Sequence, residues 1–315
     1  MPTWLTPADE SSPSTQVLIK LMLARRLSLD PEALMDDGVP IGYLHVGPTK
    51  FKHLRLGNGV RRDALTSFGQ GVARVAFALT RHESRPPPFH SASMLRESVL
   101  SSGRDNVGFG DVLTLCWSLG VPVLHLKLFP GGAKGIAAMA VRIGQRFAIL
   151  VARESGVAAQ YAFHVAHELG HIALGHLNDA TAIIDAEYYD ESEESVDVLV
   201  DDEESSADVF AQTLLTGVPD FQVIRAQSSG AKRGTPSELL HQASLAGQKR
   251  GVDPAHVLLS FAYATNEWAL ATAAIHLLPR QSEAPSNLVN RVFWSQVGTP
   301  DDEQSVSFLR AVAPV

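Results

Sequence analysis

Residues 158–177 read AAQYAFHVAHELGHIALGHL, a run in which apolar and small residues recur at helical spacing. The pattern HExxH occupies residues 167–171 within this run. Because an α-helix turns by about 100° per residue, residues four apart lie about 40° apart on one face. His167 and His171 can therefore reach a single metal ion. We predict that they are two ligands of a zinc site, with Glu168 beside them as the catalytic residue.

Glu168 is the candidate general base. It would accept a proton from metal-bound water and later deliver it to a leaving amine. Zinc would lower the pKa of that water toward neutrality and polarise the scissile carbonyl. The motif is short, so its context matters: it falls in a predicted helix that follows a predicted pair of strands. Together these features favour a zinc metallopeptidase.

A catalytic zinc usually has three protein ligands and one open position. His176 lies five residues after His171, about 140° further around a continuous helix, and is predicted to point away from the ligand pair and to be structural. Glu204 is the better third ligand, and Glu203 beside it is the competitor. The segment around Glu204 resembles the second helix of glutamate zincins, in which an Asp four residues after the ligand braces a zinc-bound histidine. This resemblance assigns Asp208 as the brace that fixes a histidine tautomer.

Residues 121–217 resemble the ImmA/IrrE family of metallo-endopeptidases more specifically. Two features differ from the family pattern. Ser206 stands where the family usually has a second glutamate, and the gap between His171 and Glu204 is long and acidic. The resemblance covers roughly 100 residues well and about twice that number loosely. Its best-matching pieces are GVPV at 120–123, FHVAHELGH at 163–171, ESSADVFA at 204–211 and LLTG at 214–217.

The resemblance implies a zinc-dependent endopeptidase that cleaves a repressor-type DNA-binding protein and so derepresses stress or mobile-element genes. One Zn²⁺ per chain is expected, with Mn²⁺ as the alternative metal. A different class of function stays open. The chain could be a metal-dependent regulatory or binding module that senses a ligand or sequesters a partner without peptidase turnover.

Further side chains are candidates for contacts with an oxyanion or a substrate. His164, three residues before His167, is one of them, although an ordinary half-buried histidine is the simpler interpretation. Tyr188 and Tyr189 are candidate donors to a tetrahedral intermediate. They lie in the segment 179–204, which holds twelve acidic residues and no Lys or Arg. This acidic segment is predicted to be a solvated loop, or a lid over the cleft.

Outside the acidic segment the chain is mildly basic, although its net charge is −8. A basic group near Lys50 suggests substrate docking or packing, and direct nucleic-acid binding is not expected. Cys116 is the only cysteine, so no internal disulfide forms and a reducing, cytoplasmic location is expected. The polar residues 1–15 carry no secretory signal, and no apolar stretch is long enough to span a bilayer.

The predicted fold class is α+β: a zincin-like metallopeptidase core in which a small sheet packs on the HExxH helix, flanked by N- and C-terminal helical regions. The proline-rich residues 85–88 suggest a boundary, which gives regions 1–88, 89–222 and 223–315. Residues 40–59 are expected to be irregular. Strands are predicted at 121–128, 136–143 and 146–152. Helices are predicted at 16–26, from 31, and at 61–81, 91–102, 109–119, 158–177, 204–215 and 254–277.

Overall fold

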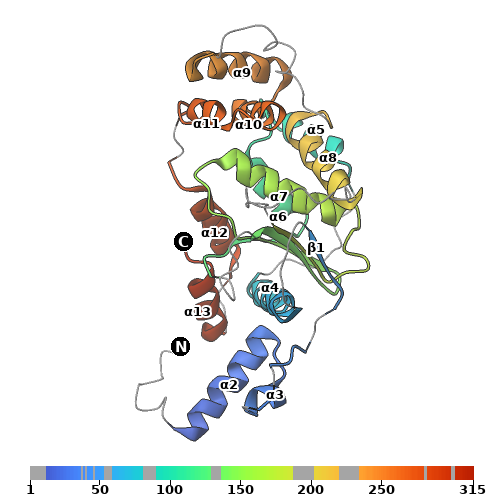
Figure 1. Cartoon of the computed structure of the whole chain (residues 1–315), viewed down its shortest axis with the longest axis vertical. Helices are drawn as coiled ribbons and strands as arrows, with labels where there is room; N and C mark the ends of the chain where they lie inside the picture. The colour runs from blue at the N-terminus through green and yellow to red at the C-terminus, as the bar shows by residue number, and fades with distance from the viewer. Residues whose placement is uncertain are drawn as a thin grey trace.

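The computed structural model describes residues 12–36, 38–39, 41–44, 47–52, 59–80, 90–128, 136–186, 202–219, 234–279, 282–298 and 302–315. Both predicted region boundaries, after residues 88 and 222, lie outside these ranges. The described residues form a mixed α+β structure in which helices cover both faces of one sheet (Figure 1). This confirms the predicted α+β class. No described helix combines the length and apolar character needed to cross a membrane.

The described strands form a five-stranded mixed sheet in the order β1-β5-β3-β4-β2. β3 and β4 pair as the predicted antiparallel hairpin around Gly144. β5 is antiparallel to β3, while the outer pairs β1–β5 and β2–β4 are parallel. The strands are β1 (Thr49–Lys52), β2 (Val123–His125), β3 (Ile136–Ile143), β4 (Arg146–Val151) and β5 (Ala182–Ala186).

Two strands correct the sequence-based prediction. The sheet was expected to lie between residues 121 and 152, but β1 forms within the stretch predicted to be irregular. β5 forms within the acidic segment that was predicted to be a loop or lid. Both strands are short, at four and five residues, and they pair with each other in parallel. Such strands gain their hydrogen bonds from neighbours distant in sequence, so local periodicity carries little sign of them.

Helices on opposite faces explain why the central strands are apolar over most of their length. α7 (Ala158–Ala173) and α6 (Phe109–Ser118) share a core with Ile149 and Val151 of β4. The alternate β4 residues, Ala148 and Leu150, belong to a second core with α4 (Gly59–Leu79). A sheet covered on both faces buries its inner strands on both sides, so β3 and β4 are hydrophobic except near their shared turn, where Arg142 and Arg146 are only partly buried.

The remaining helices surround this centre (Figure 1). The helix predicted over residues 254–277 is divided in two, because Asn266 adopts a left-handed conformation with φ 58° and ends the first half. The helix α9 (Pro236–Arg250) was not predicted individually, although it falls in the C-terminal region 223–315 that was expected to be helical. The helices are α2 (Pro13–Leu27), α3 (Pro31–Met35), α5 (Ala92–Ser101), α8 (Asp202–Thr216), α9 (Pro236–Arg250), α10 (Pro254–Thr265), α11 (Trp268–Ile275), α12 (Pro285–Gln296) and α13 (Glu303–Val312).

Candidate metal centre

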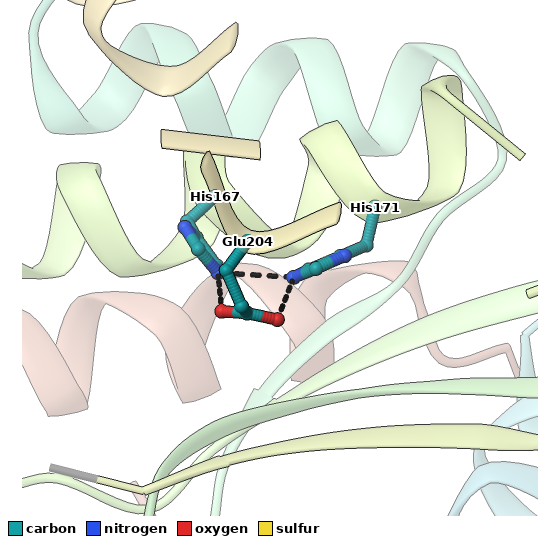
Figure 2. Close-up of side chains that lie close together, drawn as sticks. All are labelled: His167, His171 and Glu204. Atoms are coloured by element: carbon teal, nitrogen blue, oxygen red, sulfur yellow. Dashed lines mark hydrogen bonds and ion pairs between the residues drawn. The ribbon is translucent and has the colours of Figure 1, made fainter. Parts of the chain in front are cut away.

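Two histidines from α7 and one glutamate from α8 converge at a single buried point (Figure 2). The Nε2 atoms of His167 and His171 lie 3.0 Å apart. One carboxylate oxygen of Glu204 lies 3.3 Å from His167 Nε2, and the other lies 3.2 Å from His171 Nε2. All three residues are buried, with at most 7% of their surface exposed. Three potential ligand atoms from segments distant in sequence therefore meet at a largely buried point.

The charge state of Glu204 follows from these contacts. Burial alone would raise its pKa, because a carboxylate is poorly solvated away from water. Interactions with the facing rings of His167 and His171 outweigh burial and hold the pKa of Glu204 well below its usual range. The carboxylate is therefore ionised at neutral pH and provides an anionic donor beside two imidazoles.

Gly170 allows α8 to approach α7 closely enough to deliver Glu204. A Cβ atom at Gly170 would lie 3.1 Å from the Cβ of Phe210 and 3.2 Å from the backbone oxygen of Ala207. Both contacts are tighter than ordinary van der Waals separations of about 3.5–4.0 Å. The glycine within the HExxH motif thus serves helix packing, and the packing places the third side chain.

Asp208 lies one turn after Glu204 and contacts the outer nitrogen of His167. Its Oδ1 is 2.8 Å from His167 Nδ1. Because an ionised carboxylate only accepts hydrogen bonds, His167 carries its proton on Nδ1 and donates it to Asp208. The Nε2 of His167 then directs a lone pair toward Glu204 and the common point. This is the contact that the sequence resemblance led us to expect of Asp208.

Glu203, the alternative third ligand, is directed elsewhere. Its carboxylate accepts a hydrogen bond from Lys50 Nζ at 2.7 Å, and Lys50 also pairs with Asp179 at 2.9 Å. Lys50 donates in addition to the backbone oxygen of His176 at 3.0 Å. Burial would lower the pKa of Lys50, but these acidic partners raise it. Lys50 of β1 thus binds residues just after α7 and at the start of α8. Glu203 is engaged by Lys50, while Glu204 faces the two histidines.

The prediction that His176 points away from the ligand pair is wrong. Its Nδ1 lies 2.8 Å from Nδ1 of His171. The geometric extrapolation assumed a helix running to residue 177, whereas α7 ends at Ala173. Gly175 adopts a left-handed conformation with φ 79° and reverses the chain, which returns His176 toward the helix. Sequence alone offers a signal here, because a glycine just after a helical run commonly ends the helix.

Two of the other predicted site residues, Glu168 and His164, lie on α7. Glu168 is fully buried. His164 is one turn earlier, and burial, the positive Arg153 and His167 lower its pKa to about 3. It is therefore neutral at physiological pH and offers a neutral N–H rather than a cationic donor. Tyr188 and Tyr189 lie outside the described residues.

The three donor atoms fit a metal ion. Two ligands about 2.1 Å from a tetrahedral zinc lie roughly 3.4 Å apart. The distances of 3.0, 3.2 and 3.3 Å among the donor atoms approach the edges of one face of such a tetrahedron. His167, His171 and Glu204 can therefore hold a metal ion.

No protein-family model matches the chain, and no curated protein matches its sequence. The case for a function therefore rests on the residues of this site and on their geometry.

Proposed function

We propose that the chain is a zinc-dependent endopeptidase similar to the ImmA/IrrE metallo-endopeptidases, and that it cleaves a repressor-type DNA-binding protein. The observation that carries this proposal is the buried triangle of His167, His171 and Glu204, with edges of 3.0–3.3 Å. The HExxH spacing adds Glu168, a carboxyl group on the same helix as both histidines. The family assignment and the repressor substrate come from the sequence resemblance.

The donor set favours zinc over other divalent cations. Two imidazoles and one carboxylate are the ligands of many catalytic zinc sites, which leave a fourth position open. Manganese prefers carboxylate, carbonyl and water oxygens, and it is the alternative here. When bound, zinc lowers the pKa of a coordinated water and polarises a substrate carbonyl.

The protein side chains have distinct tasks in the proposed reaction. Glu168 holds the proton taken from the attacking water and transfers it to the leaving amine. Loss of such a general base typically costs 10²–10⁴-fold in rate. Asp208 holds His167 in the tautomer that presents Nε2 to the metal. His164, which is neutral, provides an N–H donor one turn before His167 for a carbonyl oxygen in the cleft.

The first test measures metal content in the purified protein by elemental mass spectrometry after zinc loading. We expect about one zinc per chain in the wild type and a sharp loss in Glu204→Ala. Glu203→Ala is the matched control, because Glu203 is adjacent but binds Lys50. It should keep its zinc. A wild type that binds no zinc would refute the proposed site, and full occupancy in Glu204→Ala would remove Glu204 from it.

The second test separates an enzyme from a binding module. Zinc-loaded wild type and Glu168→Gln are incubated with a candidate repressor, and the products are followed by mass spectrometry. We expect the wild type to cut the repressor, and Glu168→Gln to retain zinc but lose cleavage by at least about 10²-fold. A repressor that is bound but left intact by the wild type would favour the binding module. Undiminished cleavage by Glu168→Gln would exclude the proposed role of Glu168.

A further inference from the structure

His176 is a partly buried neighbour of the candidate metal centre and is not one of its three ligands. Its ring contacts His171 on the side opposite to Glu204. The two Nδ1 atoms lie 2.8 Å apart, with the ring centroids separated by 5.0 Å. His171 is fully buried, so its outer nitrogen cannot use bulk water as its partner. The ring of His176 is the hydrogen-bond partner of this nitrogen instead.

The backbone at the end of α7 fixes the position of His176. The amide of His176 donates to the carbonyl of His171 at 3.0 Å, and the amide of Gly175 donates to Ile172 at 3.2 Å. This pair of hydrogen bonds is the Schellman arrangement, which requires the left-handed residue at Gly175. Lys50 Nζ then binds the backbone oxygen of His176 at 3.0 Å. Several independent contacts therefore hold His176 against the outer edge of the His171 ring.

The hydrogen-bond partners determine where the protons lie. Ser206 Oγ donates to the backbone oxygen of Glu203 at 3.0 Å, so its hydroxyl proton is already used. Toward His176 Nε2, 3.4 Å away, Ser206 is then an acceptor. This arrangement favours the tautomer of His176 that carries its proton on Nε2 and accepts at Nδ1, with His171 Nδ1 as the donor.

The tautomer of His171 determines whether its Nε2 can bind a metal. A neutral imidazole with its proton on Nδ1 has a lone pair on Nε2. In His171 that Nε2 faces His167 and Glu204. His171 is thus held in the tautomer that a metal requires. His167 is held in the same tautomer by Asp208, but through a carboxylate rather than a neutral ring.

We propose that His176, supported by Ser206, is a positioning residue that selects the tautomer and the ring orientation of His171 for metal binding. This inference rests on the proposed function in that a metal occupies the site. The 2.8 Å contact between the two rings is itself present without the metal. The two hydrogen bonds differ in strength, because the His171–His176 contact is 2.8 Å and the His176–Ser206 contact is 3.4 Å.

Zinc affinity provides the first readout, measured by competition with a chromophoric chelator. His176→Leu removes the acceptor but keeps similar volume, and we expect its zinc affinity to fall by about 10- to 100-fold. His176→Asn can place an amide oxygen near the former Nδ1, and it should restore affinity to within a few-fold of the wild type. Ser206→Ala breaks only the longer contact and should weaken zinc binding less than His176→Leu. Unchanged affinity in His176→Leu would overturn the proposal.

The second readout needs no variant. Nitrogen NMR of histidine-labelled, zinc-loaded wild type at about pH 8 distinguishes the two imidazole tautomers. Because His171 bound to zinc through Nε2 carries its proton on Nδ1, we expect His176 to accept at Nδ1 and to carry its own proton on Nε2. A proton on Nδ1 of His176 would overturn the proposal, even if His176→Leu failed to fold. A wild type that binds zinc with the expected tautomers but cleaves no repressor would refute the proposed function and leave the positioning role of His176 intact.

Discussion

The close approach of α7 and α8 at Gly170 makes a quantitative prediction. In Gly170→Ala the new methyl group would lie 3.1 Å from Phe210 Cβ and 3.2 Å from the Ala207 oxygen. These atoms belong to α8 or lie next to its backbone, so they cannot yield by rotation of a flexible side chain. Relief requires α8 to move by a few tenths of an ångström. Overpacking of this kind typically costs about 1–3 kcal/mol.

A matched control separates this packing cost from helix propensity. Gly110 is also a helical glycine, in α6, and a Cβ there would meet nothing within 4 Å. The gain of Ala over Gly is roughly 0.5–1 kcal/mol in a helix interior. Gly110 is the second residue of α6, so Gly110→Ala should gain at most that amount, whereas Gly170 lies inside α7. The difference between the two variants therefore gives a lower bound on the packing term, and we expect Gly170→Ala to be less stable than Gly110→Ala by about 1–3 kcal/mol.

Denaturant unfolding of the metal-free proteins measures the stabilities, and chelator competition measures zinc affinity. A shift of α8 moves Glu204, whose oxygens lie only 3.2–3.3 Å from the histidines. We expect Gly170→Ala to bind zinc about 10-fold more weakly, as supporting substitutions around metal sites do, and Gly110→Ala to bind normally. Equal stability in the two variants, together with wild-type zinc affinity in Gly170→Ala, would refute the idea that this contact sets the site.

Three further predictions concern single side chains. Asp208→Ala removes the acceptor for His167 Nδ1 and should weaken zinc binding by about 10- to 100-fold in chelator competition, with an unchanged far-UV circular dichroism spectrum. Burial lowers the pKa of His256 below its usual 6.5, so the unfolded chain binds this proton first and the stability due to His256 falls as pH drops below about 6.5. Between pH 7 and 5, the free energy of unfolding should decline less in His256→Leu than in the wild type; equal declines would contradict this. Burial raises the pKa of Cys116 to about 12, so a thiol reagent at pH 8 should label it only under unfolding conditions, and rapid labelling of the native protein would exclude the buried thiol.

The sequence predicted the elements whose patterns are local. The spacing of His167 and His171 requires only that one helix forms, and α7 forms there. Glu204 was identified through the resemblance to glutamate zincins, in which an Asp follows the ligand by four residues, and both Glu204 and Asp208 lie on α8 in contact with the histidines. By contrast, β1 and β5 are short and depend on pairing with each other and with β3, so their own sequences carried little signal.

The error at His176 shows how one residue can reverse a geometric argument. The rotation of about 140° between His171 and His176 applies only in a continuous helix. The left-handed conformation of Gly175 reverses the chain, so the helix does not reach His176. The left-handed turn then converts a residue predicted to face away into the hydrogen-bond partner of a candidate ligand. Ser206 acquires a role by the same route. It stands where the similar family usually has a second glutamate, and its hydroxyl oxygen lies 3.4 Å from Nε2 of His176. The support of His171 therefore depends on where α7 ends: Gly175 signals that end in the sequence, and the path of the chain through residues 174–178 places His176 against His171.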